Sequence, residues 1–257
     1  MAKPRRGPTS YQLNKMENWN NYNQNGYQTA VQAENEWALQ RYVSGVMRRV
    51  YGKMTLGLLL TALTSYLMLL SPTLMGLLFS STATIWILFA VEIGLVIYLS
   101  ARIDKMSNGM ANAVFFLYSA LNGVALAPIF LAYTGSSIAM TFAITAGTFG
   151  AMSVAGYVTK KDLSKFGAFL FMALIGLIIC SLVNLFMHNT MMDWCISIAG
   201  VVIFVGLTAW DTQYIKRMCA EADSSMVGKV ATMGALRLYL DFVNLFLYLL
   251  RFFGSRD

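Results

Sequence analysis

Seven apolar segments, each close to the length of a membrane-spanning helix, occupy most of residues 54–253. They cover approximately residues 54–70, 83–101, 110–132, 138–158, 166–187, 193–215 and 231–253. A helix needs about 20 mostly apolar residues to cross the hydrocarbon core of a bilayer. Only 12% of the residues are charged, against about 25% in soluble domains. The chain is therefore predicted to be an all-α membrane protein with a bundle of seven transmembrane helices.

The seventh segment is the least apolar of these, because Arg237 and Asp241 lie inside it. Charged residues at membrane depth are tolerated where protein surrounds them or where they line a water-filled cavity. This segment could therefore span the membrane at the shielded centre of the bundle, or it could be re-entrant.

The segment before the first apolar stretch differs in composition from the rest of the chain. Residues 1–40 are polar and rich in Asn, Gln and Tyr, with almost no aliphatic residues to build a core. We expect them to be a disordered tail, followed by the transmembrane domain over residues 41–257. The apolar region of a cleaved signal peptide is absent from the tail, and residues 37–53 could lie along the membrane surface as a helix.

The positive charges indicate a membrane topology. Eight of the 19 Lys and Arg residues precede the first apolar segment, and most others fall in the connections 102–109, 159–165 and 216–230. The intervening connections 71–82, 133–137 and 188–192 contain none. By the positive-inside rule, the N-terminus is predicted to be cytoplasmic and the C-terminus external. The net charge of +7 therefore reflects orientation in the lipid bilayer, and nucleic acid is not an expected partner.

Two aspartates are the leading functional candidates, because Asp211 and Asp241 lie inside the last two apolar segments. A charge at mid-membrane depth costs about 2.5 to 3.5 kcal/mol even on lenient scales, so such residues usually serve an ion or proton pathway. If their carboxyl groups meet in a dry site, they should share a proton and could sense pH. They could instead hold a calcium ion transiently, with Asn244 one turn further along, or only tie two helices together.

Three further charges could complete a pathway, namely Glu92, Arg102 and Arg251. Glu92 lies within the second segment and cannot easily reach water without a cavity. Arg102, at the predicted cytoplasmic end of that segment, could lock an acid, and Arg251 lies near the outer end of the seventh. Both arginines could equally extend to the interface, as long basic side chains do.

Small residues recur every four positions in the fourth segment, at Ala139, Ala143, Gly147, Ala151 and Ala155. This spacing is typical of membrane helices that pack closely. We therefore expect the stripe to face a neighbouring helix.

The sequence offers little for a bound metal or a catalytic cofactor. Cys180, Cys195 and Cys219 have no CxxC spacing and His188 is the only histidine, so zinc and haem sites lack ligands. No cofactor is expected. An intramembrane aspartyl protease is disfavoured because the Gly-x-Gly-Asp pattern associated with such enzymes is absent, and the chain is not expected to be an enzyme. A seven-helix receptor is disfavoured because its N-terminus should be external.

Several segments resemble the Bax inhibitor-1 family, also known as the transmembrane Bax inhibitor motif proteins, and especially its bacterial members. The resemblance covers about residues 45–254. It is carried by residues 50–61 (VYGKMTLGLLLT), 117–123 (LYSALNG), 159–164 (TKKDLS), 204–213 (FVGLTAWDTQ) and 234–246 (GALRLYLDFVNLF). The stretch LYLDFVNLF is highly specific.

This resemblance implies a seven-helix bundle with the C-terminal helix central and a pH-sensitive calcium leak. The di-aspartyl sensor of the family falls on Asp211 and Asp241, and its latch arginine falls near Arg102, with a one-residue offset in spacing from Glu92. Arg237 stands where the family pattern has a small residue, one helical turn from Asp241.

Two functions follow from these observations. The first is a calcium or cation leak channel gated by protonation, in which calcium is the transported ion. The second is a stress-response interaction protein that regulates a membrane protease or another membrane protein partner without ion flux, and whose buried acids only hold the fold. In either case we expect an integral protein of the bacterial inner membrane.

Overall fold

The computed structural model describes residues 10–223 and 225–255, and within these ranges the protein forms helices and no strand. The long helices are α1 (Ser10–Leu69), α3 (Thr82–Arg102), α4 (Asn108–Ala132), α5 (Gly135–Val158), α6 (Ser164–Met187), α7 (Thr190–Glu221) and α8 (Val227–Phe253). A short helix α2 (Pro72–Phe79) and the 3-10 turn η1 (Ile103–Lys105) lie in the connections.

Seven of these helices are long and apolar enough to cross a membrane, as the sequence predicted. The main differences from the predicted boundaries are in α7, which continues to Glu221, and in α8, which begins at Val227. The additional helix α2 was not predicted. With 27 residues, α8 is about 40 Å long at 1.5 Å per residue, so it is a continuous helix of spanning length and no re-entrant loop interrupts it.

The chain divides into two units, Met1–Gly45 and Val46–Asp257. The first unit contains the N-terminal part of α1, which is helical from Ser10 onward, whereas the composition predicted a disordered tail over residues 1–40. Between Ser10 and residue 40 no proline occurs, so the backbone can continue the helix without building a core. The division of the chain into tail and bundle at residue 40 stays a prediction.

The second unit has an apolar exterior and a partly polar interior. Large exposed apolar side chains cover α3, α5 and α6, including Ile97, Phe142 and Phe169. Glu92, Asn122, Asp211 and Asp241 are buried, together with many Ser and Thr residues. This distribution suits a lipid environment, because hydrocarbon solvates apolar side chains and polar groups must find partners within the protein.

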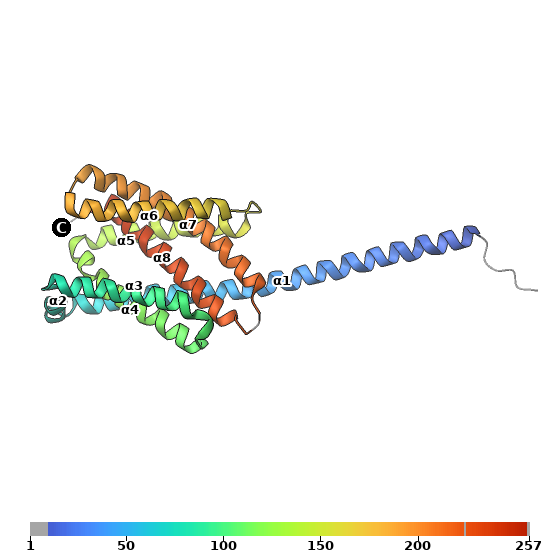
Figure 1. The fold of residues 1–257 in the computed structure, drawn as a ribbon, viewed down its shortest axis with the longest axis horizontal. Helices are drawn as coiled ribbons and strands as arrows, with labels where there is room; N and C mark the ends of the chain where they lie inside the picture. The colour runs from blue at the N-terminus through green and yellow to red at the C-terminus, as the bar shows by residue number, and fades with distance from the viewer. Residues whose placement is uncertain (1–9, 224, 256–257) are drawn as a thin grey trace, which may run out of the picture. The chain divides into compact units, whose positions relative to one another are not determined.

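Helix α8 is the most buried of the seven spanning helices. It contacts α4, α5 and α7, and hydrogen bonds join it to α1 at Thr61–Tyr239 and Lys53–Thr232. Figure 1 shows α8 in red, between α5–α7 on one side and α3 and α4 on the other. The central position of the C-terminal helix stays a prediction.

Close helix packing occurs at two glycines. A Cβ atom at Gly123 of α4 would collide with the Thr61 backbone of α1, and a Cβ atom at Gly156 of α5 would collide with the Ala209 backbone of α7. Both positions therefore exclude any larger residue.

The small-residue stripe predicted to pack in α5 instead faces outward, since all five of its residues are exposed. The buried face of α5 carries Thr141, Thr145, Phe149, Ser153 and Gly156. The physical reason is that lipid tolerates Ala and Gly, whereas a hydroxyl group gains hydrogen bonds inside. Ser153, for example, bonds with Thr212 of α7 at 2.9 Å.

Candidate functional site

The structure brings Asp211 and Asp241 together in the interior of the bundle. Asp211 lies on α7 and Asp241 on α8, two helices that contact each other. The two carboxyl groups lie close enough to interact with each other, and the residues are only 6% and 4% exposed. The carboxylate pair that the sequence permitted is therefore formed.

The lengths of α7 and α8 place both aspartates well inside their helices. Asp211 is ten residues from the end of α7 at Glu221, and Asp241 is fourteen residues from the start of α8 at Val227. At 1.5 Å per residue these positions lie about 15 and 21 Å from the helix ends. The predicted boundaries had placed Asp211 only about 7 Å deep, because the polar end of α7 does not look apolar in the sequence.

A cation lies beside this pair, and it comes from the same helix as Asp241. Arg237 Nη1 donates a hydrogen bond to Asp211 Oδ1 at 2.8 Å, and its guanidinium lies over the ring of Tyr214, 4.7 Å from the centroid. The sequence placed Arg237 one turn from Asp241 but did not indicate that it would pair with the aspartate of the other helix.

The contact between the two carboxyl groups has a chemical consequence. Ionised carboxylates only accept hydrogen bonds, so a hydrogen bond between two carboxyls requires a proton on one of them. Asp241 Oδ2 and Arg237 Nε are buried without a hydrogen-bond partner. The site therefore holds one arginine, two carboxyl groups and unused hydrogen-bonding capacity, an arrangement that can gain or lose a proton or accept a cation.

Hydroxyl groups fix the position of α7 next to Asp211. Thr212 is fully buried and contacts Ser153 of α5, which in turn bonds with the hydroxyl of Tyr51 at 2.5 Å. This chain of hydroxyls joins α1, α5 and α7. It holds the helix that carries Asp211 against two neighbours, so the depth of the pair is set by packing outside the pair itself.

Glu92 forms part of a second interior polar cluster. The residue is 6% exposed, lies close enough to Asn122 of α4 to interact with it, and has a buried oxygen, Oε1, with no partner. Asn122 Oδ1 also accepts from the hydroxyl of Tyr239 at 3.1 Å, and that hydroxyl contacts Thr61 Oγ1 at 2.6 Å. The hydrogen bonds of this cluster join α1, α4 and α8, and Glu92 of α3 keeps one buried oxygen unsatisfied.

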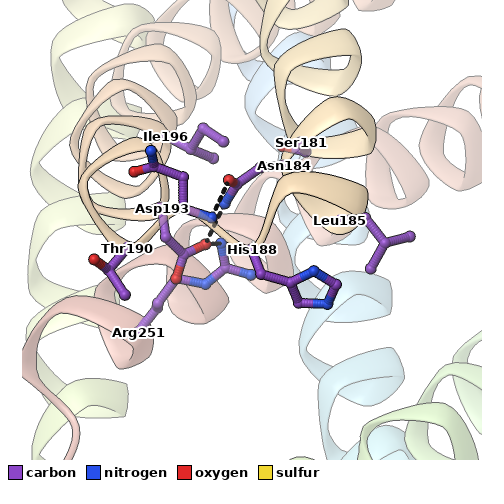
Figure 2. Close-up of a pocket in the computed structure, with 9 residues that line it drawn as sticks. Ser181, Asn184, Leu185, His188, Thr190, Asp193, Ile196 and Arg251 are labelled. Atoms are coloured by element: carbon purple, nitrogen blue, oxygen red, sulfur yellow. Dashed lines mark hydrogen bonds and ion pairs between the residues drawn. The ribbon is translucent and has the colours of Figure 1, made fainter.

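Arg251 lies in the last turn of α8 and lines a pocket of about 340 Å³. Its Nη1 donates to Asp193 Oδ1 at 3.1 Å, and Asn184 Nδ2 donates to the same oxygen at 3.4 Å. In Figure 2 these three side chains converge, and the ring of His188 points away from them. Asp193 was not singled out in the sequence, because an acid in the first turn of a helix is common.

Arg102 is exposed at the end of α3. Within the described residues it forms no ion pair, and the arginine beside Asp211 is Arg237. The structure therefore does not bring Arg102 to the aspartates. The physical reason is that Arg102 lies in the last turn of α3, whereas both aspartates lie well inside α7 and α8. A latch role for Arg102 stays a prediction.

The aspartate pair alone is a sparse set of ligands for a metal ion. Calcium takes six to eight oxygen ligands, and within the described residues no group of three or more His, Cys, Asp or Glu side chains could hold an ion. The amide of Asn244 donates to its own helix at Leu240 O, 2.8 Å away. Two carboxyl groups suit a passing ion, which keeps most of its water, better than a tightly bound one.

Comparison with known proteins identifies the family of this chain. A family described as "Inhibitor of apoptosis-promoting Bax1" matches residues 43–257. The chain belongs to the Bax inhibitor-1 family.

Relatives in this family include proteins from distant bacteria. The chain is 51% identical to the inner membrane protein YbhL of Escherichia coli K12, an alignment that covers 82% of this chain and 91% of the relative. It is 46% identical to an uncharacterized protein of Borreliella burgdorferi, with the same coverage, and 44% identical to an uncharacterized protein of Rickettsia prowazekii over 85% of this chain and 91% of the relative. The family match over residues 43–257 includes the whole second unit, and hence both aspartates.

Proposed function

We propose that this protein is a pH-sensitive leak channel for calcium or another cation, gated by the Asp211–Asp241 pair. The observation that carries the proposal is the direct contact of two buried carboxyl groups on neighbouring helices, next to one arginine. A charge change at this pair alters the interaction between α7 and α8. Since α8 also contacts α4 and α5, its displacement reaches the rest of the bundle.

Several features support ion passage over a purely structural role. Asp241 Oδ2 and Arg237 Nε have no partner, whereas a pair kept only for packing gains most when every polar atom is bonded. Glu92 supplies a second buried acid with an unpartnered oxygen in the same unit. Intramembrane acids of this kind usually mark an ion or proton path.

The proposed location is the bacterial inner membrane, the membrane named for the Escherichia coli relative. We propose a cytoplasmic N-terminus and an external C-terminus, from the alternation of basic and uncharged connections. A topology reporter fused after Asp257 tests this orientation. Reporter activity on the cytoplasmic side contradicts it.

The decisive experiment is calcium flux in liposomes that contain only the purified full-length protein. We expect flux that changes between about pH 6 and 8, the pH range in which a buried and paired carboxyl group can titrate. Asp211→Asn and Asp241→Asn each leave a single acid, so the pH response should be lost. Asp104→Asn is the matched control, because Asp104 is exposed in the η1 turn; this variant should respond to pH like the wild type.

Two results contradict the proposal in different ways. Liposomes that stay tight to calcium and to other cations at every pH favour the alternative, a stress-response interaction protein that regulates a membrane protein partner. A pH response that persists in both aspartate variants removes the sensor from this pair and leaves it a packing role.

A further inference from the structure

A basic pocket lies at the end of the bundle that carries the α5–α6 connection. It has a volume of about 430 Å³ and is lined by Thr159, Lys160, Lys161, Asp162, Gln213, Lys216, Arg217 and Ala220. Four of these residues are cationic and one is acidic, which gives a local net charge of +3. The pocket is separate from the aspartate pair, and the proposed channel function does not use it.

The floor of this pocket is held in place by α7. Gln213 accepts a hydrogen bond from the backbone nitrogen of Leu163 at 2.9 Å and donates one to the carbonyl of Lys161 at 2.8 Å. One side chain therefore fixes both sides of the α5–α6 connection. The pocket is pre-formed, so a ligand does not have to order this loop when it binds.

Two of the four cations are already committed to partners in the protein. Arg217 pairs with Asp162 at 2.5 Å, and Lys216 donates to the carbonyl of Tyr157 at 2.8 Å and lies over its ring. Lys160 and Lys161 are exposed, and among the described residues neither ammonium group has a hydrogen bond or an ion pair. These two lysines are the charges available to an external anion.

The surroundings of the pocket indicate what kind of anion fits. Val158 is exposed at the last residue of α5, and Phe166 and Phe169 are exposed within the first two turns of α6. An apolar surface on two spanning helices therefore adjoins the cationic pocket. A ligand that carries a phosphate next to acyl chains satisfies both surfaces, whereas a free phosphate uses only the first.

We propose that this pocket binds the headgroup phosphate of an anionic phospholipid, such as phosphatidylglycerol or cardiolipin, through Lys160 and Lys161. The acyl chains lie against the exposed apolar side chains of α5 and α6. Basic pockets between transmembrane helices are a known way to recognise anionic lipid headgroups.

The test is lipid binding to the full-length protein in detergent, measured by native mass spectrometry during titration with phosphatidylglycerol, cardiolipin or phosphatidylcholine. We expect the wild type to bind the two anionic lipids more tightly than phosphatidylcholine. The double variant Lys160→Gln/Lys161→Gln should lose about 10- to 30-fold in affinity for them, given the contribution of each basic residue near an anionic headgroup.

A matched control removes two positive charges elsewhere on the second unit. Arg48 and Lys105 are exposed and do not line the pocket, so Arg48→Gln/Lys105→Gln should bind anionic lipid like the wild type. Both double variants are first compared with the wild type by size-exclusion profile and melting temperature. If the pocket variant unfolds, the single variants Lys160→Gln and Lys161→Gln replace it, each with an expected loss of about fivefold.

Three outcomes overturn the proposal. Equal losses in the pocket variant and in the control variant mean that only overall charge matters. Equal binding of phosphatidylcholine means that the headgroup charge is not recognised. Displacement of the bound lipid by millimolar inorganic phosphate means that the pocket is a phosphate site and that the acyl chains contribute nothing.

Discussion

Helices α7 and α8 are joined by two Asp–Arg ion pairs of the same chemistry at different depths. In the interior pair, Arg237 lies 2.8 Å from Asp211, and the two side chains are 29% and 8% exposed. In the rim pair, Arg251 lies 3.1 Å from Asp193, and the side chains are 43% and 44% exposed. Only the interior pair has a second acid, Asp241, in contact with it.

The difference in depth gives the two pairs different physical roles. An exposed ion pair contributes about 0 to 1 kcal/mol, because water screens it and its side chains lose conformational freedom. A buried pair gains little over an apolar replacement, but loss of one partner leaves an uncompensated charge and costs about 3 to 5 kcal/mol. The interior pair is therefore sensitive to any change in charge, and the rim pair is not.

The largest expected effect is that of Arg237→Met. This change leaves Asp211 and Asp241 without a neighbouring cation, so the unfolding free energy should fall by about 3 kcal/mol at neutral pH. The measurement is reversible unfolding of the purified protein by sodium dodecyl sulfate in mixed micelles. The double variant Arg237→Met/Asp211→Asn should recover most of the loss. A double variant as unstable as the single one indicates that Arg237 acts through packing on Tyr214.

A smaller effect is expected when one hydroxyl group is removed from the buried hydrogen-bond network around Tyr239. Tyr239→Phe removes the contacts with Thr61 and Asn122 while it keeps the ring, which packs edge-on against Phe115 and Tyr118. The unfolding free energy should fall by about 1 to 2 kcal/mol, because Asn122 Oδ1 loses a donor inside the protein. An unchanged unfolding free energy means that a water molecule has replaced the hydroxyl group and that water reaches the interior near Glu92.

At the rim, Arg251→Ala should lower the unfolding free energy by less than about 1 kcal/mol. The same unfolding assay at low and high salt checks this result, and the small loss should shrink further as salt screens the pair. Asp193→Ala serves as the partner variant. A loss as large as that of Arg237→Met, independent of salt, removes the contrast between the two pairs.

The smallest effect concerns the exposed pair Asp162–Arg217 in the α5–α6 connection. The backbone N–H of Ser164, then its hydroxyl and Arg217, lower the pKa of Asp162 to about 2. A lowered pKa in the folded state stabilises this connection above the ordinary value near pH 4, and the contribution disappears as the pH falls toward 2. Arg217→Gln should raise the pKa only partly, since the Ser164 backbone remains. NMR of the labelled Asp162 carboxyl group gives the titration midpoint in the wild type and in the variant. An unchanged midpoint means that Arg217 does not contribute to the lowered pKa.

Membrane character, the number of spanning helices and the identity of the two aspartates followed from local sequence features. Apolar length is a local property, since each helix must satisfy its own backbone in lipid. Acids inside apolar segments stand out for the same reason. The alternating pattern of basic connections gave an orientation, which stays a prediction.

Other features depended on how the helices pack and could not be predicted from single segments. The polar end of α7 up to Glu221 does not differ in composition from a loop, and the apolar helix α2 has only eight residues, too few to be recognised as a spanning segment. The outward position of the small-residue stripe on α5 goes with the inward position of Ser153, whose partners Tyr51 and Thr212 lie on other helices.

The sequence alone was sufficient to place Asp211 and Asp241 inside spanning helices, because the apolar residues on either side of each aspartate are its neighbours along the chain. Only the tertiary structure decided that the carboxyl groups meet, that Arg237 pairs with Asp211, and that Arg251 turns to Asp193. The physical reason is that contacts between helices depend on their depth and rotation, which are set by packing at sites such as Gly123, Gly156 and Ser153, far along the chain from the charges that they bring together.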